Sequence, residues 1–224
     1  MQRLEAVLFD LDGTLLDSAP DIRQALNLML QDQGFPPLPL TTVKGLLGDG
    51  MMELCRKALL ASGAQETVDY YPFVQKFIAY YRQVPADPAQ IYTGGREMLQ
   101  TLHQQGIKLA ICTNKQEAAT RHLLDQLDLS RYFTAIAGGD TFMVHKPHPG
   151  HVTGLLDAME VKSQNALFIG DGMNDILACR QASVPCIIIT HGYSEDWNAL
   201  GADALMDGFD ALPAMIEKLG FSVN

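Results

Sequence analysis

The sequence lacks the features that mark a secreted, disulfide-bonded or membrane-spanning protein. No stretch approaches the 18 or so apolar residues of a membrane-spanning helix, and the apolar run before Asp10 is too short for a signal peptide. Cysteines are few and far apart, with no Cys-x-x-Cys spacing: Cys55, Cys112, Cys179 and Cys186. This pattern predicts small, buried, reduced thiols without a redox or metal role. We therefore expect a cytoplasmic protein.

Basic residues are also scarce. The chain has 16 Lys and Arg against 26 Asp and Glu, which gives a formal net charge of −10. Nucleic acids and anionic membrane surfaces attract clustered Lys and Arg, so an acidic chain is expected to bind neither. The balance says little against a small anionic substrate, because local charge decides binding at a site. The oligomeric state cannot be read from the sequence.

Short apolar runs alternate with helical patterns along most of the 224 residues. Each run has the composition of a strand that is buried on both faces. Strands that alternate with helices predict βαβ units, and hence a doubly wound α/β fold with a parallel sheet. The expected strands cover residues 6–9, 108–112, 166–169 and 186–189.

One segment interrupts this alternation. Between about Ser18 and Val84 there is no strand-like run, and the apolar residues fall at helical spacing. One helix is expected at Met52–Ala61, directly after the loop Gly48-Asp49-Gly50. We predict an all-helical cap at residues 17–85, inserted into an α/β core made of residues 1–16 and 86–224. Since the insert leaves the core just after the first strand, it should act as a lid, with hinges at 17–18 and 84–88.

Polar residues follow three of the expected strands, where the chain leaves the sheet, and Lys146-Pro147 begins the segment before another helix. The ends of parallel strands meet at one edge of a sheet, so these segments should converge there. A carboxylate nucleophile can split phosphate-ester hydrolysis into two displacements, and Asp10 is the candidate. Carboxylates also suit Mg²⁺, which Asp10 and Asp171 could bind. The segments are Asp10-Leu11-Asp12-Gly13-Thr14, Thr113-Asn114, Lys146-Pro147 and Gly170-Asp171-Gly172-Met173-Asn174-Asp175.

This set of motifs resembles the haloacid dehalogenase (HAD) superfamily, which carries Asp-x-Asp-x-Thr, a Thr or Ser, a Lys and Gly-Asp-x-x-x-Asp in this order. The resemblance implies a Rossmann-like core, Mg²⁺ as cofactor and an aspartyl-phosphate on Asp10. It implies metal ligands at Asp10, Asp171 and the backbone carbonyl of Asp12, whose side chain would be the general acid and base. It also implies that Thr113, Asn114, Gly13 and Lys146 bind the phosphoryl group, and that Asp175 orients Lys146 or a metal-bound water.

Within the superfamily, the chain resembles the phosphoglycolate phosphatases through Asp-Gly-Thr-Leu-Leu-Asp-Ser, Thr-Asn-Lys, and Gly-Gly-Asp followed by Lys-Pro. A small phosphorylated metabolite is therefore the expected substrate. Two departures bear on this reading. Gly172 stands where such relatives often have a hydroxyl residue, and Asp49 adds a negative charge to the cap loop. Lys44 and Arg56 flank this loop and could offset the charge.

Other functions and sites remain open on the sequence. A phosphosugar mutase resembling β-phosphoglucomutase would use the same residues, and a non-catalytic binding protein could retain the fold. His145, His148 and His151 are three residues apart and could suggest a transition-metal site. Pro147 and Pro149 interrupt any regular helical face there, so the histidines are instead read as loop and helix-start residues.

Overall fold

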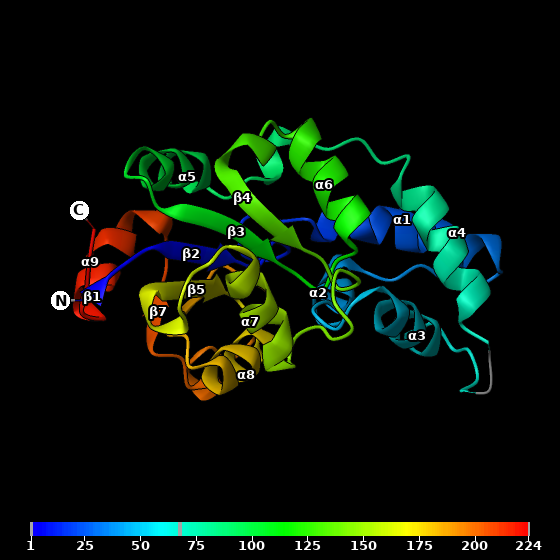
Figure 1. Cartoon of the computed structure of the whole chain (residues 1–224). Coiled ribbons are helices and arrows are strands. Elements are labelled where there is room, and N and C mark those ends of the chain that lie inside the picture. The colour runs from blue at the N-terminus through cyan, green and yellow to red at the C-terminus, as the bar shows by residue number, and fades with distance from the viewer. Residues whose placement is uncertain (1, 67–68, 224) are drawn as a thin grey trace.

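The computed structural model describes residues 2–66 and 69–223, and a parallel six-stranded sheet lies at its centre (Figure 1). The strands follow the order β4-β3-β2-β5-β6-β7, in which the connections change direction at β2. In such sheets the ligand crevice lies beyond the carboxyl ends of the strands at this switch point. The strands are β2 (Ala6–Phe9), β3 (Lys108–Cys112), β4 (Phe133–Ala137), β5 (Ala166–Gly170), β6 (Cys186–Ile189) and β7 (Ala204–Met206).

Helices cover both faces of this sheet, so the prediction of a doubly wound α/β fold is confirmed. One face carries α5 (Gly95–Gln104), α6 (Glu117–Gln126) and α9 (Leu212–Lys218); the other carries α7 (Pro149–Ala158) and α8 (Met173–Ala182). The side chains of β2 alternate between the two layers, because successive residues of a strand point to opposite faces. Val7 and Phe9 pack on one face, and Ala6 and Leu8 on the other.

Short elements complete the core. Strands β1 (Gln2–Arg3) and β8 (Phe221–Ser222) pair beside the main sheet and bring the two ends of the described chain together. The 3-10 turns are η1 (Pro88–Gln90), η2 (Ser130–Tyr132), η3 (Ser163–Asn165), η4 (Asn198–Leu200) and η5 (Phe209–Ala211). Strands β4 and β7 were not predicted. Both are edge strands, and neither is buried along its whole length, so neither shows the continuous apolar run of the central strands.

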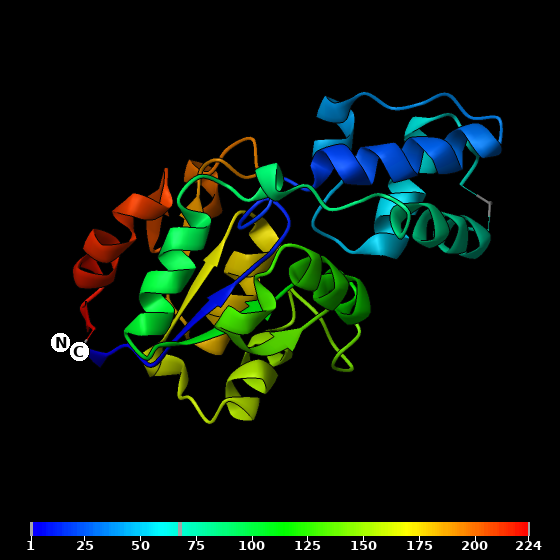
Figure 2. The ribbon, with the colours of Figure 1, turned by 90° about the horizontal axis from the view of Figure 1, so that it is seen from above.

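Four helices form a separate body beyond the carboxyl ends of the strands (Figure 2). They are α1 (Ala19–Asp32), α2 (Leu40–Lys44), α3 (Met51–Ala61) and α4 (Tyr71–Tyr81), and they share a hydrophobic cluster of their own. The two segments that connect them to the core are hydrogen bonded to each other. The Asp17 N–H donates to the Gln90 carbonyl at 2.8 Å, and the Tyr92 N–H donates to the Leu15 carbonyl at 3.1 Å. The exact division into residues 17–85 and the rest stays a prediction.

Two further expectations can be checked against the structure. All four cysteines are buried and free of disulfide bonds, as predicted. Across residues 2–66 and 69–223, none of the helices has the length and apolar character needed to cross a bilayer.

Candidate active site

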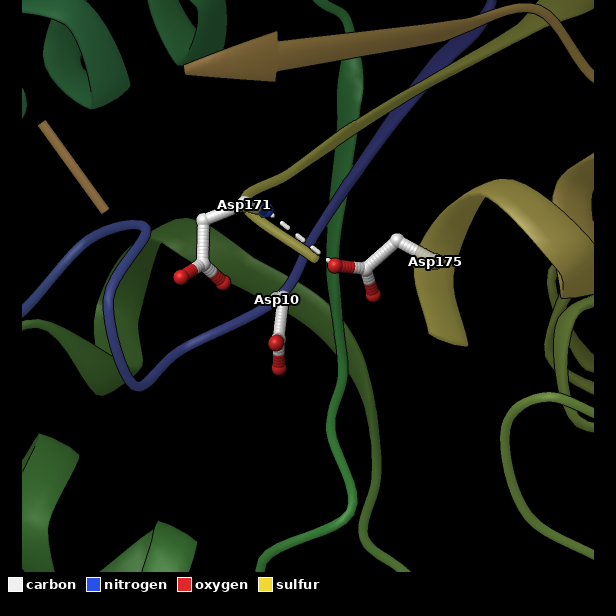
Figure 3. A group of neighbouring side chains, drawn as sticks. All are labelled: Asp10, Asp171 and Asp175. Atoms are coloured by element: carbon white, nitrogen blue, oxygen red, sulfur yellow. Dashed lines mark hydrogen bonds between the residues drawn. The ribbon is translucent and has the colours of Figure 1, made fainter. Parts of the chain in front are cut away.

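Three aspartates meet where β2 and β5 end, at the switch point of the sheet (Figure 3). Asp10 follows β2 and Asp171 follows β5, while Asp175 lies in the first turn of α8. One carboxylate oxygen from each lies within 4.8 Å of the other two. The strand order produces this cluster, because β2 and β5 are adjacent and parallel. The predicted convergence of the first and last motifs is therefore present in the structure.

The charge of this cluster is poorly compensated by the protein alone. Burial, followed by the charges of Asp10 and Asp175, raises the pKa of Asp171 well above its usual value. Burial also raises the pKa of Asp10 to about 6, although the nearby ammonium of Lys146 acts in the opposite direction. Carboxylates that resist ionisation in this way favour an additional cation. Asp10 and Asp171 are therefore suited to hold a divalent metal ion.

Lys146 supplies the fixed positive charge of the site. Its Nζ lies 3.1 Å from Asp10 Oδ1 and 2.6 Å from Asp175 Oδ1, and its side chain is only 1% exposed. Burial opposes the charge of this ammonium, but the two carboxylates raise the pKa of Lys146 above its ordinary value. The lysine is thus held as a cation against the candidate nucleophile.

Asp175 supports its neighbours with both carboxylate oxygens. Oδ2 accepts hydrogen bonds from the backbone N–H groups of Asp171 and Gly172, each at 3.1 Å, and Oδ1 accepts from Lys146. This arrangement is compatible with the predicted supporting role of Asp175, although the role itself stays a prediction. Gly172, which departs from the family pattern, contributes through its backbone.

Asp12 lies on the other side of Asp10 and is held by two side chains. Its carboxylate accepts from the Ser18 hydroxyl at 2.5 Å and from Lys115 Nζ at 2.9 and 3.0 Å. Ser18 directly precedes α1, so Asp12 is tied to the start of the helical body. No role was predicted for Lys115, which follows Thr113 and Asn114 in the Thr-Asn-Lys motif. The available signal was a lysine two residues beyond the strand-end Thr113.

Thr113 and Asn114 follow β3 and face the same space. Thr113 is buried, and its hydroxyl accepts from the Lys115 N–H at 3.3 Å. The Asn114 amide nitrogen donates to the carbonyls of Lys146 and Gly48, at 2.8 and 2.9 Å. Both amide hydrogens are thereby engaged, so in this arrangement the side chain connects the core to the cap loop. Its predicted contact with phosphate stays untested.

Gly13 allows the chain to pass directly beneath Asp171. Its φ of +84° lies in the left-handed region, which glycine adopts without steric cost. A Cβ atom at this position would lie 2.3 Å from Asp171 Oδ2. That oxygen accepts from the Tyr193 N–H at 2.7 Å, so it has little freedom to move. Gly13 therefore has a geometric reason to be glycine, besides its predicted place near the phosphate.

A cavity of about 60 Å³ lies between these residues and the helical body. On the core side it is lined by Asp10, Asp12, Thr113, Asn114 and Lys115. The helical side is largely apolar, with Ile22, Leu47, Met51, Leu54, Phe77 and Tyr81. Phe77 and Tyr81 of α4 both line the cavity, and their rings stack with centroids 5.6 Å apart. A ligand here would be enclosed by both bodies.

The cap loop is hydrogen bonded to the core beside this cavity. Asn174 Nδ2 donates to the Gly48 carbonyl at 3.1 Å and to Asp49 Oδ1 at 2.7 Å. Asp49 also forms an ion pair with Lys57. The negative charge of Asp49 is therefore neutralised by its own neighbours, outside the residues that line the cavity.

The other charged and titratable candidates do not line the cavity. Lys44 pairs with Asp17 at 3.7 Å and Arg56 with Glu53, and neither lines the cavity. His151 is buried, and its Nδ1 accepts the Lys146 N–H at 3.2 Å. Within the part of the chain that the structure describes, the three aspartates are the one group with metal-ligand geometry.

Comparison with known proteins agrees with this fold. Residues 7–189 match the model of the family described as haloacid dehalogenase-like hydrolase. The chain therefore belongs to this family, as its motifs predicted. A phosphoglycolate phosphatase of Agrobacterium fabrum is 39% identical over 215 residues, which cover 95% of this chain and 92% of that protein. A phosphoglycolate phosphatase of Caulobacter vibrioides is 38% identical, over 92% of this chain and 88% of that protein.

Solved structures show the same architecture. The crystal structure of a predicted phosphoglycolate phosphatase from Haemophilus somnus has a TM-score of 0.90 at 27% identity, and covers 96% of this chain and 99% of that one. A β-phosphoglucomutase from Clostridium difficile has a TM-score of 0.81 at 22% identity, covering 96% of each chain. At that identity the second similarity shows a common fold alone.

Proposed function

We propose that the chain is a Mg²⁺-dependent phosphatase that hydrolyses phosphoglycolate, or a closely similar small monoester, through an aspartyl-phosphate on Asp10. Hydrolysis of a phosphoric monoester follows from the family and from the relatives that share nearly the whole chain. The observation that carries the mechanism is the position of Asp10, between the ammonium of Lys146 and the carboxylate of Asp171.

The residues present suit a hard divalent ion. Mg²⁺ prefers one or two carboxylates together with oxygen atoms of substrate and water, and Asp10 and Asp171 would provide the carboxylates. The Asp12 carbonyl would be a third protein ligand, as the family resemblance implies. When bound, the ion would neutralise negative charge on the phosphoryl group and on the aspartates. Every proposed ligand is an oxygen atom, which suits a hard ion such as Mg²⁺ better than the softer ions that thiolate or imidazole ligands favour.

The side chains divide the reaction into two displacements. In the first, a carboxylate oxygen of Asp10 attacks phosphorus, and the bond to the ester oxygen breaks as Asp12 donates a proton to that oxygen. In the second, a water attacks the phosphorus of the aspartyl-phosphate and gives its proton to Asp12, which releases phosphate and regenerates Asp10. Lys146 and Thr113 stabilise the charge on the phosphoryl oxygens during both displacements.

The helical body acts as a lid in this proposal. Its apolar residues cover the cavity and would keep bulk water from the aspartyl-phosphate while the first product is still bound. The cavity is small and largely apolar on this side, which favours a compact substrate over a polyhydroxylated sugar phosphate. The names of the most similar relatives agree with a substrate of this size.

Acid trapping of the intermediate tests the proposal directly. The protein is mixed with ³²P-labelled phosphoglycolate and Mg²⁺, quenched in acid and mapped by mass spectrometry. We expect label on Asp10 and release of free phosphate, and we expect excess EDTA to abolish both. Asp10→Asn should lose about 1,000-fold or more in turnover, because its amide is a poor nucleophile.

Asp157→Asn provides a matched control, because Asp157 is an exposed aspartate of α7. It should remain fully active. Turnover without any adduct on Asp10, or full activity in EDTA, would refute the mechanism. Transfer of the label to a second substrate molecule in place of free phosphate would indicate the mutase reaction.

A further inference from the structure

Lys115 contributes a positive charge to the lining of the cavity. Among the lining residues that the structure describes, it is the single Lys or Arg. Its side chain is 7% exposed and its Nζ contacts both oxygens of Asp12. The same Nζ lies 4.9 Å from the centre of the Tyr81 ring on α4. The ammonium is therefore held between the core and the helical body, at the border of the cavity.

Other cations near the site are committed elsewhere. Lys146 lies under Asp10 and Asp175, and does not line the cavity. Lys44 has a side chain 36% exposed and pairs with Asp17, while Arg56 pairs with Glu53 outside the cavity. A substrate with a second anionic group beside its phosphate would therefore meet one cation within the described lining, and this cation is Lys115.

The position of Lys115 relative to Asp12 defines which second group it could reach. In the proposed mechanism, Asp12 faces the ester oxygen that leaves with the product. Lys115 Nζ is within hydrogen-bond distance of both carboxylate oxygens of Asp12, so it lies directly beside the leaving group. A carboxylate on the carbon next to the ester oxygen would lie on this side of the substrate.

We propose that Lys115 is a specificity-determining residue, which binds the carboxylate of a 2-phosphooxy carboxylic acid beside Asp12. This inference rests on the proposed phosphatase function and adds the residue that recognises the organic part of the substrate. An ammonium has three N–H donors and no acceptor, so Lys115 can serve Asp12 and a substrate carboxylate together. Apolar walls from Leu54 and Phe77 strengthen such an ion contact, because they exclude water from it.

The competing role for Lys115 is to position Asp12 and nothing else. The two roles differ in what they do to substrates that lack the carboxylate. If Lys115 only positions Asp12, its loss lowers kcat/KM equally for every phosphate monoester. If it binds the carboxylate, its loss raises KM for carboxylate substrates in particular.

A two-substrate comparison separates these roles. Phosphoglycolate and ethyl phosphate have the same chain length, and differ in a carboxylate against a methyl group. We expect the wild-type protein to prefer phosphoglycolate, mainly through KM. Lys115→Met should reduce this preference at least ten-fold, while Lys115→Arg, which keeps a cation, should retain most of it.

Lys76→Met is the matched control, since it removes the same charge from a lysine of α4 that pairs with Asp32 outside the cavity. It should leave the preference for phosphoglycolate within two-fold of wild type. An equal loss of kcat/KM for both substrates in Lys115→Met would overturn the proposal in favour of the positioning role. If Lys115→Met fails to fold, Lys115→Gln, which is also neutral, takes its place. A loss of the preference for phosphoglycolate with intact ethyl phosphate turnover supports recognition, and a proportional loss on both substrates overturns it.

The outcome is distinct from a failure of the proposed function. Ethyl phosphate hydrolysis that depends on Asp10 establishes the phosphatase, whatever Lys115 does. If the wild-type protein hydrolyses ethyl phosphate and phosphoglycolate with equal kcat/KM, the phosphatase stands and carboxylate recognition fails.

Discussion

Replacing Gly13 by alanine should damage the active site far more than the fold. The added Cβ would lie 2.3 Å from Asp171 Oδ2 and 2.8 Å from Asp171 Cγ, whereas ordinary carbon–oxygen contacts begin at about 3.3 Å. One partner must therefore move by about 1 Å. Movement of Asp171 would stretch its 2.7 Å hydrogen bond from the Tyr193 N–H and displace a proposed metal ligand. A misplacement of about 1 Å at the reacting centre costs about 100-fold in rate.

Gly34→Ala isolates the backbone part of this effect. Gly34 has a similar φ of +78°, against +84° at Gly13, but a Cβ there would meet no atom within 4 Å. Each alanine should cost about 1–2 kcal/mol for the left-handed conformation, or a few degrees of melting temperature for a chain of this size. Melting curves and kcat/KM are measured for both variants. If Gly13→Ala keeps kcat/KM within two-fold of Gly34→Ala, the contact with Asp171 does not control activity and the reasoning is wrong.

Three further predictions concern charge, pH and the cap loop. Lys146→Met leaves two buried carboxylates without their cation, so it should lower the free energy of unfolding in urea by about 3–5 kcal/mol. It should also reduce kcat at least about 100-fold, the order of magnitude for losing one group that stabilises transition-state charge. Burial lowers the pKa of His151 to about 4. The neutral ring is therefore favoured in the folded state, and its contribution is complete above pH 6.5 and declines as the pH falls toward 4. Between pH 7 and pH 5 the protein should lose about 2 kcal/mol through this group, which urea titrations at the two values can measure. Asn174→Ala removes the hydrogen bonds to Gly48 and Asp49, so KM should rise about ten-fold with little change in kcat, as steady-state kinetics will show.

For each of these three predictions, a particular result would contradict it. Lys146→Gln, which is also neutral, should be as inactive as the methionine variant, and near-normal turnover in either would remove Lys146 from the mechanism. The drop in stability between pH 7 and pH 5 should be smaller in His151→Asn than in wild type, and unchanged in His122→Asn, whose histidine is exposed. An equal drop in all three proteins would assign the effect to carboxylates. For Asn174→Ala, a fall in kcat with an unchanged KM would place Asn174 in the chemical step.

The central strands and their carboxyl ends were predictable from the sequence because their signals are local. A short apolar run that ends in an aspartate marks both a buried strand and a polar strand end, as at Phe9-Asp10 and Ile169-Gly170-Asp171. The ordering of such ends at one edge then follows from the geometry of parallel sheets. The edge strands β4 and β7 lack this signal, since an edge strand is only partly buried and shows no continuous apolar run.

Contacts that depend on three-dimensional packing were beyond the sequence. The pairing of Lys115 with Asp12 joins residues that are 103 positions apart, so its place near a strand end could not show which carboxylate Lys115 contacts. The same holds for Asn174 and the cap loop, because a polar residue at the start of a helix is equally typical of a cap. By contrast, Arg56 pairs with Glu53 three residues earlier on α3, a local contact that helical spacing allows.

The paired connections between the two bodies restrict how the helical body can swing. Backbone hydrogen bonds join Asp17 to Gln90 and Leu15 to Tyr92, so the two connecting segments form one paired linker instead of two independent ones. A helical body on such a paired linker should rotate about one hinge axis, and so present the same cavity-lining residues to Asp10 each time it closes. An insertion in only one connecting segment would break the pairing and release that alignment. Evolutionary insertions should therefore be tolerated within the helical body and not in the two connecting segments.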